Sequence, residues 1–156
     1  MKTMRAAFET PLGTTLVVDS AGDRILSARF ARTTKVDGGR PADALLREAK
    51  RQVDAYFRKR LTRFDLPLHL QGTDIQIDVW AFVAGLETGQ LISYGDLARS
   101  IGRPRAHRGV AAAMRMTPID LFIPAHRVVG SDGSVRGAGP NSVRRRLLAF
   151  EGITLR

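Results

Sequence analysis

The side chains best suited to proton transfer in this sequence are its three histidines, His69, His107 and His126. Histidine changes its charge near neutral pH. The chain contains no cysteine, which excludes disulfides, thiolate zinc sites and a thiol nucleophile. No second nucleophile and no set of metal ligands accompanies the histidines. An enzyme built around His126 alone is therefore the weakest interpretation, and we expect neither a metal nor a cofactor.

Arginine dominates the second part of the chain. Residues 91–156 carry 11 basic side chains, all arginine, and 4 acidic ones. Residues 1–90 carry 14 basic and 11 acidic side chains. The whole chain has a net charge of +10 and a pI near 11.3. Arginine is suited to bidentate contacts with phosphate, so a polyanion such as nucleic acid is an expected partner. A GC-rich genome is the alternative explanation for the arginine content.

Length and composition predict an ordered globular protein. The chain has 156 residues, of which 44% are apolar and 26% charged, enough for one ordinary domain or two small ones. No apolar run approaches the roughly 18 residues of a membrane span, and no apolar block typical of a secretory signal follows the first residues. We therefore expect no membrane association and a cytoplasmic location, with the nucleoid as the site in a bacterium.

The first 70 residues predict a small sheet and one helix. Alternating and β-branched residues predict a meander of short strands near residues 4–8, 14–19 and 25–30. Apolar residues at spacings of three and four predict a helix from about Pro41 to Leu61. Residues 64–70 alternate like a strand, and Pro67 makes it an edge strand or a bulge.

Gln71-Gly72-Thr73 marks the expected boundary between two domains, residues 1–71 and 72–156. Thr73 or Asp74 can cap the helix that follows. No internal repeat or low-complexity tract interrupts either part.

Two further helices are predicted beyond this boundary. Ser93 can cap the first, and the second extends from about Ala106 to Met116, after a turn that contains Gly102. Two short helices joined by a turn with glycine are typical of a helix-turn-helix. Helical hairpins without a DNA function share this pattern, so the signal alone leaves both interpretations open.

The segment Ile123-Pro124-Ala125-His126-Arg127-Val128 resembles the active-site motif Pro-Cys-His-Arg-Val of the O6-alkylguanine-DNA alkyltransferases, with alanine in place of the cysteine. Other blocks resemble the same family in the same order. They are Gly72-Thr73-Asp74 through Val79-Trp80, Ser93-Tyr94-Gly95-Asp96-Leu97-Ala98, Ala106-His107-Arg108-Gly109-Val110 and Phe150-Glu151-Gly152, and the turn Thr10-Pro11-Leu12-Gly13 is similar to the family's first turn.

This resemblance implies an α+β fold. An N-terminal α/β domain with a small antiparallel sheet, ribonuclease H-like, would precede a C-terminal helical, winged-helix-like DNA-binding domain. The recognition helix would enter the minor groove, and the alkylated guanine would rotate out of the duplex. Arg108 matches the arginine that fills the vacated space, and Tyr94 matches the tyrosine that helps to rotate the 3′ phosphate. A solvated arginine and a core tyrosine are the structural alternatives.

Other positions are expected to contact DNA or to line the alkylguanine pocket. The additional DNA contacts are Arg103, Arg105 and Arg115, with Arg144 to Arg146 as further phosphate contacts. The pocket residues are Tyr94, Pro124, Ala125, Val128 and Ala138.

The chain departs from the family pattern where the chemistry takes place. Methyl transfer requires a thiolate, and Ala125 has no lone pair to activate. His126 and Glu151 match the relay that generates the thiolate, so they are left with a structural role, in which they pack the motif strand against the last helix. Thr117 replaces a hinge asparagine, and Ala138 replaces a tyrosine that usually walls the alkyl pocket, which would leave a roomier, more apolar pocket.

These departures make the chain similar to the alkyltransferase-like proteins. The leading interpretation is a monomeric, non-catalytic sensor that binds and flips O6-alkylguanine in duplex DNA and flags it for nucleotide excision repair proteins. The first alternative is an alkyltransferase whose cysteine was replaced by alanine at position 125. The second is a transcription regulator that uses only the helix-turn-helix.

Overall fold

The computed structural model describes residues 2–32, 41, 43–135 and 142–153. The chain divides into two compact units. The N-terminal unit comprises Met1–His69 and Pro118–Phe122, and the C-terminal unit comprises Leu70–Thr117 and Ile123–Arg156. The first contains an antiparallel sheet and a helix and the second is mainly helical, so the α+β architecture is confirmed. The boundary between residues 71 and 72 stays a prediction.

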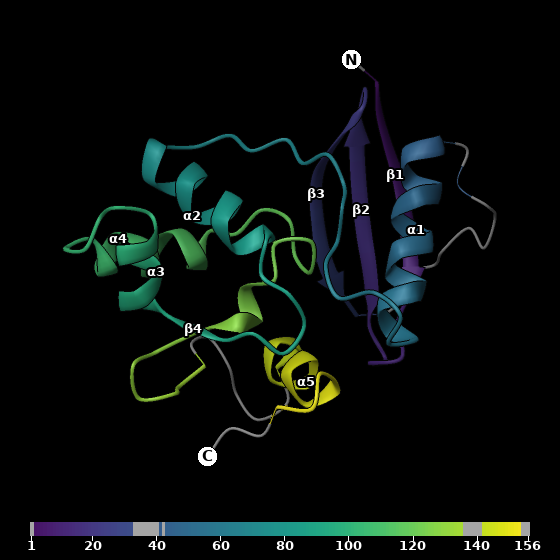
Figure 1. The fold of residues 1–156 in the computed structure, drawn as a ribbon. Coiled ribbons are helices and arrows are strands. Elements are labelled where there is room, and N and C mark those ends of the chain that lie inside the picture. Colours follow the sequence, from purple (N-terminus) through teal and green to yellow (C-terminus); the bar gives the residue numbers. More distant parts are fainter. Residues whose placement is uncertain (1, 33–40, 42, 136–141, 154–156) are drawn as a thin grey trace. The chain divides into compact units, whose positions relative to one another are not determined.

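The sheet of the N-terminal unit is a three-stranded meander, as predicted (Figure 1). Its strands are β1 (Thr3–Glu9), β2 (Thr15–Ala21) and β3 (Arg24–Ala31), with β2 in the centre. Both edges of β2 are paired, and the consecutive residues Leu16, Val17 and Val18 are at most 4% exposed, so side chains on both faces of this strand are buried.

Helix α1 (Ala44–Phe57) lies along the sheet (Figure 1). It begins three residues later than predicted, because the side chain of Asp43 accepts the N–H of Leu45 at 2.7 Å and caps the helix there. It ends at Phe57, so Leu61 lies beyond it. The residues that α1 buries are Leu46, Ala49, Gln52, Val53 and Tyr56.

The strand predicted at residues 64–70 is wrong: only Leu68 forms a bridge, a parallel one with Ile25. The competing partner is Gln52 of α1. Its amide donates to the carbonyl of Asp65 at 2.9 Å and accepts the N–H of Asp65 at 2.8 Å. Both backbone groups of Asp65 are therefore occupied by a side chain, and Pro67 has no N–H to donate to a ladder.

Residues Pro118–Phe122 return to the N-terminal unit, which no sequence pattern indicated. Ile119 forms a parallel bridge with Ala28, and the ring of Phe122 packs on that of Phe64 with centroids 5.0 Å apart. Leu121 has a φ of +69°, and the N–H of Phe122 donates across it to the carbonyl of Asp120 at 2.8 Å. This γ-turn is strained for a residue with a large side chain, so its packing must hold it in place.

The C-terminal unit contains four helices among its described residues: α2 (Asp74–Ala84), α3 (Tyr94–Ser100), α4 (His107–Arg115) and α5 (Val143–Phe150). The predicted caps are confirmed. Thr73 forms a capping box with Gln76, and the hydroxyl of Ser93 accepts the N–H of Asp96 at 3.0 Å. None of the helices in the described parts of the chain is long and apolar enough to cross a membrane.

The motif residues form a turn rather than the strand that was expected. Ala125–Arg127 make a 3₁₀ turn, η1, in which the N–H of Arg127 donates to the carbonyl of Pro124 at 2.9 Å. Strand pairing starts only at β5 (Val128–Val129), which is parallel to β4 (Ile92–Ser93). The β4–β5 pair therefore ties the motif to the start of α3.

Candidate nucleic-acid interface and the buried Glu151 network

Helix α4 presents two arginines to solvent. It buries Val110, Ala113 and Met114 and leaves Arg108 and Arg115 exposed. The arginines are seven residues apart and so lie two turns apart on the same face of the helix. Neither forms an ion pair with any residue in the described parts of the chain. Both predicted DNA contacts are thus free to bind phosphate or to enter a groove.

The residues between these arginines that are not buried are small. Ala111 and Ala112 are partly exposed, and Gly109 follows Arg108. Small side chains allow a helix backbone to approach a narrow groove, since no bulky group separates the two. This face of α4 could therefore seat closely on a duplex.

Helix α4 is held firmly against α2 from behind. A Cβ atom on Gly109 would come within 2.8 Å of the Cδ1 of Ile75, so any larger residue would require the Ile75 side chain to shift. The indole Nε1–H of Trp80 donates to the carbonyl of Ala113 at 2.9 Å. The hydroxyl of Thr117 donates to the carbonyl of Met114 at 2.8 Å, so this threonine stabilises the end of α4 locally.

The beginning of α4 is electropositive. Its N-cap residue, Ala106, provides no side-chain hydrogen bond, and the first turn contains no acidic residue. The first N–H groups are thus left for solvent or an anion. Arg105 and His107 are exposed beside this end. Arg103 is partly occupied by Asp78, with 3.1 Å between Nη2 and Oδ2, but both side chains are about half exposed and the pair is weak.

Arg144 has a partner that the sequence did not indicate. Its Nη2 donates to the carbonyl of Met114 at the end of α4, at 3.1 Å. This bond ties α5 to α4 and leaves Arg144 less available for phosphate than predicted. Arg145 and Arg146 are half-buried.

The predicted pocket residues that the structure describes are all largely buried. Tyr94 and Ala125 are each 7% exposed, Val128 is 1% exposed and Pro124 is buried. The fifth, Ala138, lies outside the described residues. The role of these five positions as a pocket stays a prediction.

Glu151 joins the end of α5 to the motif turn. Its Oε2 lies 2.5 Å from the Nε2 of His126 and accepts the Nη2–H of Arg127 at 2.9 Å. Its Oε1 accepts the Nε–H of Arg127 at 3.0 Å and the N–H of Gly89 at 3.3 Å. All three charged or titratable side chains are at most 1% exposed. We refer to His126, Arg127 and Glu151 as the buried triad.

The protonation state of the triad follows from its burial. Burial lowers the pKa of His126 and outweighs the hydrogen bond and charge of Glu151, which raise it. The charges of Arg127 and Arg144 lower this pKa further. His126 is therefore neutral near pH 7. Because a carboxylate only accepts hydrogen bonds, the imidazole proton lies on Nε2 and leaves Nδ1 as an acceptor.

A neutral imidazole with a carboxylate behind it can serve as a general base. The preceding residue in η1 is Ala125, whose methyl group has no proton to give up and no lone pair to attack with. The arrangement thus contains a proton acceptor without a nucleophile. No group of three or more His, Cys, Asp or Glu side chains that could hold a metal ion occurs within residues 2–32, 41, 43–135 and 142–153.

Sequence analysis missed the role of Arg127. Its guanidinium makes two bonds to Glu151 and also donates to the carbonyl of Leu86 at 2.7 Å and to the hydroxyl of Thr88 at 3.2 Å. The available signal was an arginine within a mostly apolar segment, since residues 121–130 are all buried. A charge in such a segment requires a partner of opposite charge.

Comparison with protein families identifies both parts of the chain. Residues 4–70 match the family described as 6-O-methylguanine DNA methyltransferase, ribonuclease-like domain. Residues 74–153 match the family described as 6-O-methylguanine DNA methyltransferase, DNA binding domain. The matches support the predicted succession of a ribonuclease-like α/β domain and a helical DNA-binding domain.

Individual proteins agree with this result. A methylated-DNA–protein-cysteine methyltransferase of Methanosarcina acetivorans is 35% identical over 154 residues, which cover 94% of this chain and 97% of the relative. The crystal structure of the Mycobacterium tuberculosis O6-methylguanine methyltransferase matches with a TM-score of 0.81 and 33% identity, over 96% of this chain and 93% of the other. A Mycobacterium tuberculosis OGT crystallised in complex with DNA matches with a TM-score of 0.78 and 34% identity, over 93% and 90%.

Proposed function

Because the chain belongs to the O6-methylguanine DNA methyltransferase family but contains no cysteine, we propose that it is a non-catalytic sensor of O6-alkylguanine in duplex DNA. The observation that carries this proposal is Ala125. It stands between Pro124 and the neutral His126, at the position where the resemblance places the nucleophile. A protein that keeps the triad and lacks the sulfur can hold the modified base without accepting its alkyl group.

The chemistry supports a binding role. Transfer of an alkyl group from the guanine O6 requires a nucleophile that forms a bond to carbon while the carbon–oxygen bond breaks. The methyl group of Ala125 cannot form that bond, and the chain contains no cysteine that could replace it. His126 and Glu151 then stabilise the motif turn instead of activating a thiol.

The exposed face of α4 supports a role in DNA binding. We propose that Arg108 fills the space that the rotated guanine vacates, with Tyr94 against the 3′ phosphate and Arg103, Arg105 and Arg115 on the backbone. Arg108 and Arg115 are exposed and without an ion-pair partner among the described residues, as such contacts require. Extrusion of a base costs a few kcal/mol of pairing and stacking, less for a damaged base, and an inserted arginine offsets part of that cost.

The proposal extends to the pocket and to the partners. We propose that Tyr94, Pro124, Ala125, Val128 and Ala138 surround the alkylated base, and that Ala138 in place of a tyrosine admits groups larger than methyl. The protein would act as a monomer in the cytoplasm or on the nucleoid, and it would pass the lesion to nucleotide excision repair proteins. No cofactor enters this scheme.

The direct test compares two duplexes that differ only in one O6-methylguanine. We expect tighter binding to the modified duplex, measured by fluorescence anisotropy at fixed salt. Equal affinity for both would contradict the sensor. A series from O6-methyl to O6-benzyl should show level or rising affinity, since each buried methylene contributes up to about 0.8 kcal/mol. Ala138→Tyr should penalise the bulky groups most.

A second test addresses the chemistry. Incubation with DNA that carries a labelled O6-methyl group should leave no label on the protein. Stoichiometric label on any side chain would end the sensor proposal. Ala125→Cys should restore some transfer, because the neutral His126 and its partner Glu151 remain. A folded variant without transfer would show that the altered pocket also disables the chemistry.

One alternative has support from the relatives, whose names describe cysteine methyltransferases. In that case alanine was introduced at position 125 of an active alkyltransferase. A cysteine codon at this position of the gene would establish this alternative. The replacements at Thr117 and Ala138 favour the natural sensor, because a single engineered change would not include them. A transcription regulator would instead prefer a fixed DNA sequence over a lesion.

A further inference from the structure

The N-terminal unit carries a dense basic cluster just after α1. Arg58, Lys59, Arg60 and Arg63 occupy four of six consecutive positions, and the two residues between them, Leu61 and Thr62, are uncharged. All four basic side chains are exposed. We refer to these four residues as the α1 basic cluster. The helix predicted to extend to about Leu61 would include residues 58–60, yet they lie beyond α1, which ends at Phe57.

The backbone under the cluster is fixed by a tight turn. The N–H of Lys59 donates to the carbonyl of Tyr56 at 3.0 Å, and the N–H of Arg60 donates to the carbonyl of Ala55 at 2.9 Å. This pair of bonds is a Schellman motif, which requires a left-handed residue at its centre. Lys59 takes that position with a φ of +60°.

Glycine is the residue that this position favours, because a Cβ atom disfavours the left-handed conformation. The chain has lysine there, between two arginines. Residues that depart from a local conformational preference, as Lys59 does here, often have a functional role. Here the departure adds one more positive charge to the cluster.

The turn rests on a rigid base. Tyr56, in the last turn of α1, is 2% exposed, and its ring lies against that of Phe64 with centroids 5.4 Å apart. Phe64 follows Arg63 directly and is 9% exposed. Buried aromatic rings thus anchor the chain just before and just after the cluster. The cluster is therefore presented from an ordered turn.

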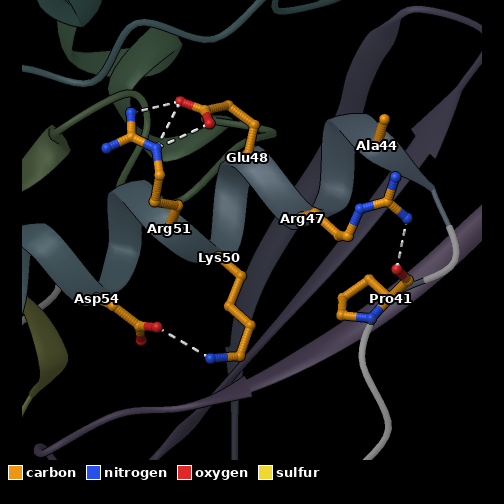
Figure 2. A pocket seen from close by; sticks show the side chains of 7 residues that line it. All are labelled: Pro41, Ala44, Arg47, Glu48, Lys50, Arg51 and Asp54. Carbon is orange, nitrogen blue, oxygen red and sulfur yellow. Dashed lines mark hydrogen bonds and ion pairs between the residues drawn. The ribbon is translucent and has the colours of Figure 1, made fainter.

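The remaining surface of α1 has a different electrostatic character. Figure 2 shows an open hollow along the helix. The charged side chains that line this hollow have polar partners within it. The Nζ of Lys50 lies 2.9 Å from the Oδ2 of Asp54, and the Nη2 of Arg51 lies 2.5 Å from the Oε1 of Glu48. The guanidinium of Arg47 donates to the carbonyl of Pro41 at 3.1 Å. By contrast, Arg58, Arg60 and Arg63 form no ion pair with any carboxylate in the described parts of the chain.

The helix dipole does not account for the cluster. Cations near a helix C-terminus are favourable, but the effect is confined to the last turn. That turn contains no basic residue, and the Schellman bonds already satisfy the carbonyls of Ala55 and Tyr56. A single cation would suffice for the dipole, whereas the guanidinium groups of Arg58, Arg60 and Arg63 repel one another unless an anion lies among them.

We propose that the α1 basic cluster binds the phosphate backbone of duplex DNA, as a second contact surface besides α3 and α4. Three of its four members are arginines, whose guanidinium groups match phosphate. A second copy of the chain is an unsuitable partner, because each copy carries a net charge of +10. The C-terminal unit matches a DNA-binding domain, so duplex DNA is already held on the same chain at high local concentration.

This contact reads no base and detects no lesion. It adds affinity that is independent of sequence and strongly dependent on salt. The inference therefore goes beyond lesion sensing and does not depend on it.

The test uses the full chain with Arg58, Arg60 and Arg63 all changed to Gln. Affinity for an unmodified duplex of 30 base pairs is measured at several salt concentrations. The slope of log K against log salt should fall by about 0.9 for each lost phosphate contact, hence by roughly 2–3 in total. Binding at low salt should weaken about tenfold or more.

The matched control changes Arg47, Lys50 and Arg51 to Gln, which also removes three positive charges, but from the paired surface of α1. Its slope should stay near that of the unmodified protein. Equal slopes for the cluster variant and the unmodified protein would overturn the proposal. Equal losses in the cluster variant and the control would also overturn it, since they would reflect net charge alone.

Two further measurements keep the result interpretable. Lys59→Gly relieves the left-handed strain, so it should fold at least as stably and should still lower the slope by about one. Polyglutamate of matched charge should compete poorly with DNA; displacement as effective as that by unlabelled duplex would assign the cluster to an acidic protein and overturn the proposal. The ratio of affinities for modified and plain duplex should stay constant in all cluster variants. A ratio of one in the unmodified protein would refute lesion sensing and leave this inference standing.

Discussion

Replacement of Arg127 by methionine should strongly destabilise the C-terminal unit. Methionine keeps an unbranched, apolar side chain in the same space but removes every hydrogen bond of the guanidinium. Four bonds are lost: two to Glu151 at 2.9 and 3.0 Å, one to the carbonyl of Leu86 at 2.7 Å and one to the hydroxyl of Thr88 at 3.2 Å. The Glu151 carboxylate, whose side chain is 0% exposed, then keeps only His126 and the N–H of Gly89 among these partners.

The expected loss follows from this burial. Removal of one partner of a buried, hydrogen-bonded ion pair costs about 3–5 kcal/mol, because the other charge stays out of water without compensation. For a chain of this size each kcal/mol corresponds to about 2–4 °C in Tm. Thermal unfolding followed by circular dichroism should therefore show a decrease of roughly 6–20 °C.

The loss should depend on pH with a definite sign. The charge of Arg127 is one of the causes that lower the pKa of His126, so its removal should raise this pKa. As the pH falls from 7.5 to 5.5, His126 should then become protonated and replace Arg127 as the cation beside Glu151. The destabilisation of Arg127→Met should thus be smaller at pH 5.5 than at pH 7.5, and NMR titration of the imidazole should show the raised pKa.

The chain provides a matched control for this prediction. Arg5 also forms two bonds to one carboxylate, that of Asp19, at 2.8 and 3.1 Å. Its side chain is 61% exposed, so water can replace the partner and Arg5→Gln should lower Tm far less than Arg127→Met. Comparable losses in the two variants would refute the reasoning, because burial would then not determine the cost.

Three further predictions concern single residues. Burial lowers the pKa of His126, so the unfolded chain binds more protons than the folded chain below pH about 6.5. The free energy of unfolding should therefore fall as the pH decreases from 7 to 5. This fall, measured as Tm against pH, should be smaller in His126→Gln. Arg108→Ala should reduce binding to a duplex with O6-methylguanine far more than binding to plain duplex, whereas Arg115→Ala should weaken both alike; equal effects of Arg108→Ala on both duplexes would exclude a role in lesion recognition. Lys59→Gly should stabilise the protein by about 1 kcal/mol, read as a higher urea midpoint, because glycine adopts the left-handed conformation without strain; a lower midpoint would show that Lys59 packs in a way that outweighs the strain.

Short-range patterns in the sequence were sufficient for most secondary structure of the C-terminal unit. Thr73 and Ser93 cap their helices as predicted, and α4 occupies the predicted range between Ala106 and Met116. Caps and helical faces depend on residues within four positions of one another, so the sequence alone contains the needed information. The absence of a cysteine thiol is likewise a property of the amino-acid composition, which folding does not change.

The N-terminal unit shows where such patterns fail. The alternation of residues 64–70 predicted a strand, but the side chain of Gln52 occupies the backbone groups of Asp65, 13 residues away. The cap at Asp43 shortened α1 at its start, and the left-handed Lys59 follows a helix end that apolar spacing had extended to Leu61. The spacing of apolar residues contains no information on side chains that compete for backbone hydrogen bonds.

The sequence by itself determined that the protein has no thiol nucleophile. It also contained the family motifs and predicted the recognition helix. Only the tertiary structure decided which charges are buried and which are exposed. Arg127 and Arg108 are the same residue type in one arginine-rich region, yet Arg127 is 1% exposed beside Glu151 and Arg108 is exposed on α4. That difference arises because a buried guanidinium requires a carboxylate, and the fold brings Glu151 to Arg127 across 24 residues of chain.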